Sequence, residues 1–84
     1  MEMYELEARY DARASFYGKA TVIEKEDCIQ LRSYSTIVAE IRGGKATVFG
    51  WYSATTGRHI KEFLIQNGFY AKNKEQILKD YGEG

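Results

Sequence analysis

The fold is decided between residues 42 and 69, in the stretch RGGKATVFGWYSATTGRHIKEFLIQNGF. Its Gly43-Gly44 pair predicts a β-hairpin, because a two-residue Gly-Gly loop can supply the positive φ angles of a type I′ turn. The two strands of this hairpin are expected at residues 36–42 and 45–51. The same stretch holds the only Trp and the only His of the chain, and its clearest helix start.

The register of the hairpin sorts its side chains onto two faces. With Arg42 opposite Lys45, strict alternation gives each face every second residue. The predicted core face is apolar throughout: Ile37, Ala39, Ile41, Ala46 and Val48. The other face mixes polar and large apolar side chains: Thr36, Val38, Glu40, Thr47, Phe49 and Trp51. We expect this second face to be partly covered by a neighbouring element or offered to a partner, and the sequence leaves the exposure of its aromatic rings open.

Two helices are predicted after the hairpin. The main one spans about residues 54–67, because Ser53 or Thr55 can cap its start and Gly68 can end it in a left-handed conformation. Its sheet side is expected to carry Thr56, Ile60, Phe63, Leu64 and Asn67, and its outer side Arg58, Lys61, Glu62 and Ile65. A capping-box spacing at residues 73 and 76 predicts a short helix at about residues 74–81, which packs through Ile77, Leu78 and Tyr81.

Further strands are expected upstream of the hairpin. Alternation predicts a first strand whose buried face carries Tyr4, Leu6, Ala8 and Tyr10. A helix is the alternative, since Met3, Leu6 and Tyr10 would also lie along one side of it. A bend at residues 11–15, a strand at 16–25, a turn at 25–27 and a shorter strand at 28–34 are expected to follow. We therefore predict one α+β domain of residues 1–84, with an antiparallel sheet of about four to five strands packed against one main helix.

The composition limits the possible functions. Hydrophobic residues make up 44% of the 84 residues and Pro is absent, which predicts an ordered core. Lys plus Arg and Asp plus Glu both number 12, so the chain as a whole has no net attraction for nucleic acid or anionic membranes. One Cys and one His are too few for a zinc site in a monomer, and no metal or other cofactor is expected.

The sequence predicts a soluble, cytoplasmic protein. No apolar run approaches the roughly 20 residues that a membrane helix needs, and the N-terminal residues lack the pattern of a signal peptide. A single cysteine, Cys28, leaves no intramolecular disulfide and fits a reducing compartment. The chain is not expected to bind membranes.

The junction between hairpin and helix is the predicted binding site. Its candidate residues are Trp51, Tyr52, Ser53, Thr55, Thr56, Arg58, His59 and Lys61. Hydroxyl groups, unpaired N–H groups at a helix start and nearby cations are the groups that bind anions such as phosphate. Ordinary capping and packing would account for the same residue types.

Three functions are compatible with this junction. Proteins that bind single-stranded nucleic acid combine aromatic rings with cations. Here the aromatic residues are Phe49, Trp51 and Tyr52, and the cations that follow them are Arg58, Lys61, Lys72 and Lys74. A protein-binding inhibitor or adaptor would use an exposed Trp51 instead. A phosphate- or nucleotide-handling enzyme would use His59, but no third group to orient its ring is identifiable and no catalytic residue is assigned. A non-enzymatic binding module is therefore the favoured prediction.

Three strings carry a resemblance to a known family: YDARASFYGKA (residues 10–20), LRSYSTIVAEI (31–41) and GWYSATTGRHIKEFLIQNGF (50–69). Together they resemble a small domain of unknown function found in phages and mobile elements of Gram-positive bacteria. The resemblance implies a protein that acts in a bacterial cytoplasm for a mobile element, where small domains commonly bind nucleic acid or a host protein. It implies no catalytic residue, and it leaves the oligomeric state open.

Overall fold

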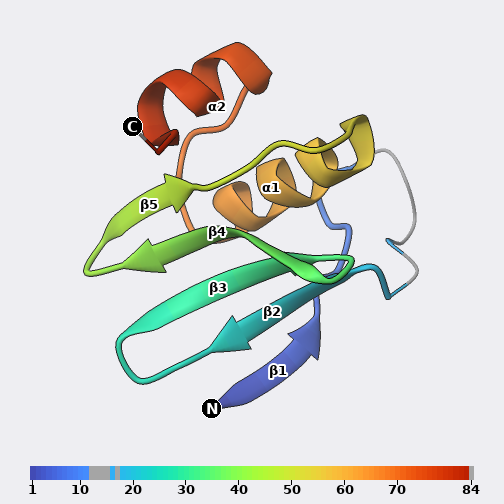
Figure 1. Ribbon diagram of the computed structural model, residues 1–84, viewed down its shortest axis with the longest axis vertical. Helices are drawn as coiled ribbons and strands as arrows, with labels where there is room; N and C mark the ends of the chain where they lie inside the picture. Colours follow the sequence, from blue (N-terminus) through green and yellow to red (C-terminus); the bar gives the residue numbers. More distant parts are fainter. Residues whose placement is uncertain (12–15, 17, 84) are drawn as a thin grey trace.

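The computed structural model describes residues 1–11, 16 and 18–83, and its centre is a five-stranded antiparallel sheet in the order β1-β2-β3-β4-β5 (Figure 1). The strands are β1 (Glu2–Glu5), β2 (Ala20–Glu24), β3 (Cys28–Ser33), β4 (Thr36–Arg42) and β5 (Lys45–Val48). Two helices follow, α1 (Ala54–Gln66) and α2 (Lys74–Tyr81). The predicted α+β class is confirmed.

The predicted hairpin has its predicted register. Arg42 lies opposite Lys45, and Gly43 and Gly44 have positive φ angles of 58° and 78°. Strand β5 ends at Val48 and not at residue 51 as predicted, although the N–H of Phe49 still donates to the carbonyl of Val38 on β4.

The bend predicted at residues 11–15 lies largely outside the described residues. The strand predicted at 16–25 starts too early, because β2 begins only at Ala20. Before it, Gly18 has a positive φ of 74° and the N–H of Lys19 donates to the carbonyl of Phe16, so the chain turns there.

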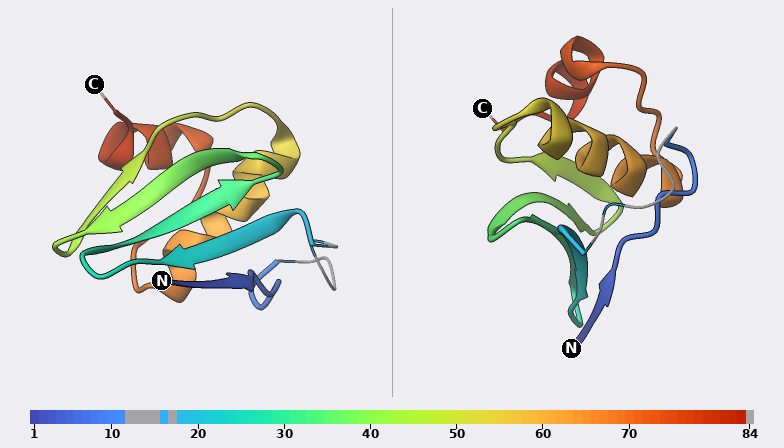
Figure 2. Two further views of the ribbon diagram at one scale, coloured as in Figure 1. Left: turned by 60° about the horizontal axis from the view of Figure 1, so that its bottom comes forward. Right: turned by 90° about the vertical axis from the view of Figure 1, so that its right-hand side faces the viewer.

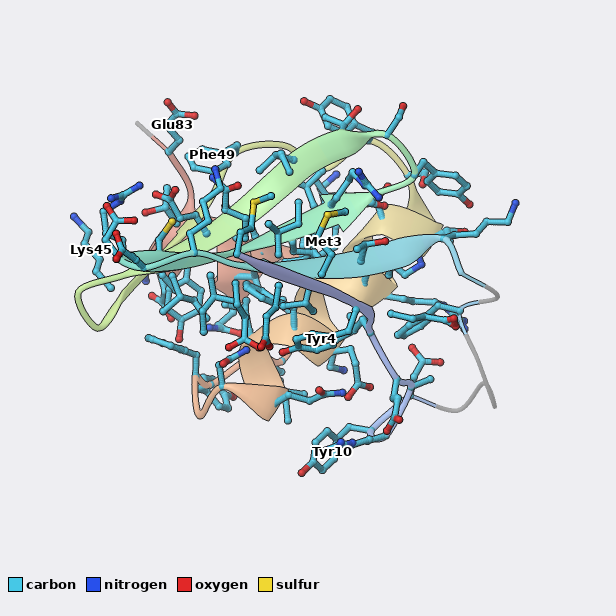
Figure 3. All side chains as sticks on the ribbon, turned by 90° about the horizontal axis from the view of Figure 1, so that it is seen from below. Met3, Tyr4, Tyr10, Lys45, Phe49 and Glu83 are labelled. Atoms are coloured by element: carbon cyan, nitrogen blue, oxygen red, sulfur yellow. The ribbon has the colours of Figure 1, made fainter. Side chains whose placement is uncertain are left out.

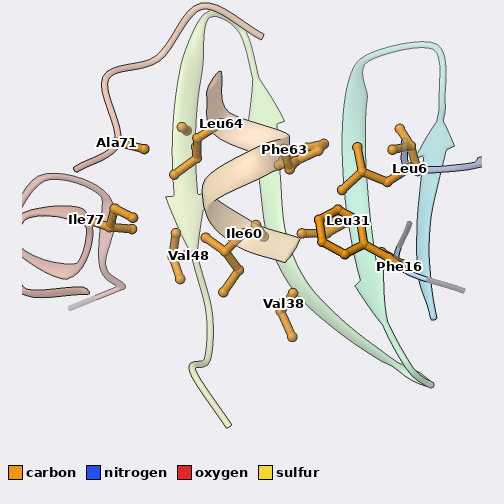
Figure 4. Close-up of a cluster of buried hydrophobic side chains, with 14 residues drawn as sticks. Leu6, Phe16, Leu31, Val38, Val48, Ile60, Phe63, Leu64, Ala71 and Ile77 are labelled. Carbon is orange, nitrogen blue, oxygen red and sulfur yellow. The ribbon is translucent and has the colours of Figure 1, made fainter. Parts of the chain in front are cut away.

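Helix α1 crosses one face of the sheet, and no other described helix lies over the opposite face (Figure 2). Ile60, Phe63 and Leu64 of α1 are fully buried. They pack against sheet residues that include Leu31 and Val48 (Figure 4). Burying one such side chain contributes roughly 1.5–3 kcal/mol, and this packing therefore sets the position of α1.

Helix α2 packs beside the edge strand β5. Its Ile77 is fully buried, and a parallel bridge joins Val48 to Gly82 just after the helix. The N–H of Glu83 donates to the carbonyl of Val48, so this edge of the sheet is partly paired. Neither of the two described helices is long and apolar enough to cross a membrane.

Two hairpin residues face the opposite way from the prediction. Val38 is fully buried in the core, whereas Ile37 is only partly buried. The register between β3 and β4 shifts after Leu31, so that Val38 is an extra residue on β4. Such a β-bulge shifts the alternation by one residue, and the assignment of Ile37 and Val38 to their faces was wrong for this reason.

The first strand is shorter than predicted and its face is less buried. Leu6 is buried, but Tyr4 and Tyr10 are 47% and 64% exposed. β1 is an edge strand that pairs only with β2, and the last backbone hydrogen bond between the two segments runs from Leu6 N–H to the carbonyl of Ala20. The chain then leaves the sheet, so the alternation beyond Leu6 has no sheet to face.

The helix caps agree with the prediction. Ser53 Oγ accepts a hydrogen bond from the N–H of Thr56 at 3.1 Å, and Gly68 ends α1 with a φ of 84°. Asn73 Oδ1 caps α2 by accepting from the N–H of Gln76 at 2.9 Å.

Two residues predicted in the main helix were placed on the wrong side, Glu62 within α1 and Asn67 at its C-cap. Asn67 is exposed, because α1 ends there and the side chain of Asn67 donates back to the carbonyl of Phe63. Glu62 is 2% exposed, because the segment that follows β1 covers it. In that segment the N–H of Tyr10 donates to Glu62 Oε1 at 2.8 Å.

Candidate functional site

A groove of about 310 Å³ lies between the first turns of α1 and the start of α2. We call it the basic groove, and it is lined by Trp51, Ala54, Gly57, Arg58, Lys61, Lys72, Asn73, Lys74 and Ile77. Four of these residues carry a positive charge and none carries a negative charge. The chain as a whole has a formal net charge of zero, so the groove is a local concentration of positive charge.

Trp51 lies directly against the backbone of α1 in this groove. The close approach depends on Gly57, because a Cβ atom at that position would overlap the indole ring. The ammonium group of Lys74 lies 5.9 Å from the centroid of the Trp51 ring, within the range of a cation–π interaction. The indole is partly exposed, so part of the ring is accessible to a ligand.

The four cations come from two segments that are distant in the sequence. Arg58 and Lys61 are both exposed and lie one turn apart on α1, and Lys72 and Lys74 flank the N-cap of α2. Arg58 is partly neutralised by Asp11, with 3.4 Å between the guanidinium and the carboxylate. In the part of the chain that the structure describes, the three lysines form no ion pair.

A second group of residues forms a polar cluster on the inner side of α1, which we call the buried polar cluster although Ser53 at its rim is exposed. The Ser53 hydroxyl donates to Thr56 Oγ1 at 3.3 Å, and the hydroxyls of Thr56 and Ser33 are 3.1 Å apart. Ser33 Oγ lies 2.9 Å from Nδ1 of His59. Phe16 packs edge-on against the His59 ring, with 4.7 Å between the ring centroids. The cluster thus joins β3 to the first two turns of α1.

The burial of His59 inside this cluster favours the neutral form of its imidazole. Burial lowers its pKa, and the nearby negative charge of Asp11 partly opposes the change. Nε2 of His59 is buried and has no hydrogen-bond partner among the described residues. A hydroxyl within hydrogen-bond reach of an imidazole resembles an activated nucleophile, but Ser33 and His59 are only 3% and 0% exposed. A substrate in solution does not reach either group in this structure.

Cys28 lies on another part of the molecule. Its side chain is buried at the start of β3, and this burial raises the pKa of the thiol. The guanidinium of Arg42 opposes the change, while the carboxylate of Asp27 adds to it. The thiol is therefore protonated at neutral pH and is a poor nucleophile.

The eight predicted binding residues separate into three sets. Those that line the basic groove are Trp51, Arg58 and Lys61. Those in the buried polar cluster are Ser53, Thr56 and His59. Tyr52 and Thr55 belong to neither place, and Tyr52 is 68% exposed with its ring close to Gly50. Sequence reasoning missed Ser33 as a partner of His59, because the two residues are 26 positions apart and no motif links them.

The fold and the groove define a small α+β domain whose positively charged groove contains an indole ring. The chain belongs to the DUF8033 family of unknown function, whose family model matches residues 4–79. This range includes every residue that lines the basic groove and every residue of the buried polar cluster. No curated protein and no solved structure matches the chain.

Replacing Gly57 with Ala should destabilise the protein. A Gly-to-Ala change inside a helix normally stabilises by about 1 kcal/mol, but here the new methyl group would overlap the indole of Trp51. We expect a lower free energy of unfolding in urea and a changed tryptophan emission. In a Trp51→Ala background the same change should regain its usual stabilising effect. Equal stabilisation in both backgrounds would show that the ring does not rest on Gly57.

Stability should fall as the pH drops below about 6.5, the ordinary pKa of histidine. Because burial lowers the pKa of folded His59, the unfolded chain takes up a proton at a higher pH than the folded chain does. The contribution of neutral His59 to stability is complete above its pKa in the unfolded chain, and it is lost as the pH falls toward its pKa in the folded chain. Urea unfolding between pH 7.5 and 5 measures this slope, which should become smaller in His59→Phe and in His59→Gln. An unchanged slope in both variants would assign it to carboxyl groups.

Proposed function

We propose that this protein binds single-stranded nucleic acid in the basic groove. The observation that carries the proposal is the convergence of four cations and one indole on a groove whose lining includes no carboxylate. Single-strand binders combine positive charge for the phosphates with aromatic rings on which bases stack. Trp51 would provide the ring, and Arg58, Lys61, Lys72 and Lys74 would contact the phosphates.

The charge distribution favours a single strand over a duplex. Duplex-binding domains usually carry a broad basic surface, whereas this chain is neutral overall and basic in one place. Contacts to as many as four phosphates of a single strand predict a slope of roughly −3 for log K against log salt. The slope should be somewhat shallower than this, because Asp11 competes for Arg58.

Two alternatives use the same region of the molecule. An acidic protein segment would also pair with the four cations, but it has no base that would stack on Trp51. A phosphate-handling enzyme based on His59 has less support, because His59 and its neighbour Ser33 are buried. As the biological setting we propose a bacterial cytoplasm and a phage or other mobile element, and the support for this is the resemblance of the three strings quoted above.

Fluorescence anisotropy with labelled oligo-dT and oligo-U of about 20 nucleotides tests the proposal. Binding should weaken as salt is raised, and bound nucleotides should quench the emission of Trp51. The double variant Arg58→Ala/Lys61→Ala should lose on the order of tenfold or more in affinity, and its salt slope should become shallower by about 1.4.

The matched control is Lys25→Ala/Lys45→Ala, which removes the same charge from two exposed lysines outside the groove. This control should bind almost as tightly as the unchanged protein. Absent binding, or equal losses in both double variants, would contradict the proposal. Binding of poly-glutamate as tight as that of oligo-dT, with Trp51 unquenched, would favour an acidic protein partner instead.

A further inference from the structure

A second hollow lies on the other side of the same two cations. Its volume is about 230 Å³, and it is lined by Tyr10, Asp11, Arg58, Lys61, Glu62 and Ile65. We call it the Tyr10 hollow. Arg58 and Lys61 line both this hollow and the basic groove. The outer surface of α1 therefore presents two cations with an aromatic residue in the hollow on each side, Trp51 in one and Tyr10 in the other.

The backbone of Tyr10 is held in place while its ring is left exposed. The N–H of Tyr10 donates to Glu62 Oε1 at 2.8 Å. The side-chain amide of Gln66 donates to Glu62 Oε2 and to the carbonyl of Glu7, both at 2.6 Å. These bonds fasten the segment to α1, yet Tyr10 is 64% exposed, and Figure 3 shows its ring projecting away from the ribbon. An anchored, exposed ring is suited to stacking on a flat ligand.

The two carboxylates of the Tyr10 hollow are engaged with the protein. Glu62 is 2% exposed and both of its oxygens accept hydrogen bonds. The side chain of Asp11 is 13% exposed and pairs with Arg58. Both carboxylates of this hollow therefore interact with protein groups and are little exposed to solvent, whereas Lys61 beside them is exposed.

We infer that Tyr10 provides a second stacking position for the same nucleic-acid strand, on the far side of Arg58 and Lys61 from Trp51. The inference rests on the proposed function. One base stacks on Trp51, another stacks on Tyr10, and phosphates between them lie over the two cations. Because an α-helix with its side chains is about 10 Å wide, the strand that crosses it must be several nucleotides long. The ligand is thus an oligonucleotide and not a mononucleotide.

Anisotropy with a series of labelled oligo-dT strands of two to twelve nucleotides tests this inference. Affinity should rise steeply once the strand is long enough to reach both rings. Tyr10→Ala should lower the affinity for the twelve-nucleotide strand by on the order of tenfold, as is typical for the loss of one stacked base. It should leave the affinity for the two-nucleotide strand nearly unchanged. Tyr10→Phe keeps a ring and should retain the affinity of the unchanged protein.

Tyr70→Ala is the matched control, because Tyr70 is also 64% exposed and lines neither hollow. Unaltered circular dichroism and Tm would show that each variant is folded. If the unchanged protein binds and Tyr10→Ala behaves like Tyr70→Ala, the second stacking position is wrong while the basic groove stands. If no strand binds the unchanged protein at any length, the proposed function itself is wrong.

Discussion

The position of α1 on the sheet is the constraint on which the other features depend. Ile60, Phe63 and Leu64 are fully buried, and they fix the rotation of α1 about its own axis. This rotation places His59 and Glu62 on one flank of α1 and Gly57 on the opposite flank, with Arg58 outermost. The residues on the two flanks are therefore packed against different parts of the protein.

On the first flank, buried polar side chains acquire partners, as burial requires. His59 Nδ1 lies within hydrogen-bond distance of Ser33 Oγ, and Glu62 accepts a hydrogen bond from the N–H of Tyr10. On the other flank, the missing side chain of Gly57 leaves room for the indole of Trp51. The two hollows therefore arise from one packing arrangement, in which the same helix buries its apolar face and displays its cations between two aromatic residues.

The neutral total charge of the chain hides an uneven distribution. On the sheet, Arg42 is paired with Asp27 at 2.5 Å and with Glu40 at 3.3 Å, and these contacts hold the pKa of both carboxyl groups below its usual range. That cation is thus neutralised where it lies. The lining of the basic groove, in contrast, includes four cations and no carboxylate, although Arg58 is also in contact with Asp11. This local imbalance is the electrostatic basis of the proposed function.

Local sequence signals were sufficient for most of the fold. The Gly43-Gly44 turn predicted the hairpin and its register, and the caps at Ser53 and Asn73 predicted where the helices begin. The burial of Val38 could not be predicted, because a bulge depends on how β3 and β4 pair and not on β4 alone. The burial of Glu62 could not be predicted either, since it depends on a segment 52 residues away.

In the candidate site too, some features had a local sequence signal and others depended on packing between distant segments. The junction at residues 51–59, with Lys61 just beyond it, was singled out by its residue types, since helix caps, cations and aromatic rings cluster there in the sequence. Three of its eight residues, Trp51, Arg58 and Lys61, line the basic groove. The position of Tyr10 beside Arg58 and Lys61 had no local signal, because its alternation with neighbouring residues predicted a buried strand. Only the packing of that segment on α1 brings it beside the same two cations.

Amide chemical shifts measured by NMR can map whether a single strand binds across the outer surface of α1. A twelve-nucleotide oligo-dT strand would be titrated into the ¹⁵N-labelled protein. We expect the largest changes at the indole N–H of Trp51, at Gly57 and Arg58, and at residues 72–74. Changes confined to the opposite face of the sheet, at residues such as Thr21, Gln30 and Thr47, with the groove unaffected, would contradict it.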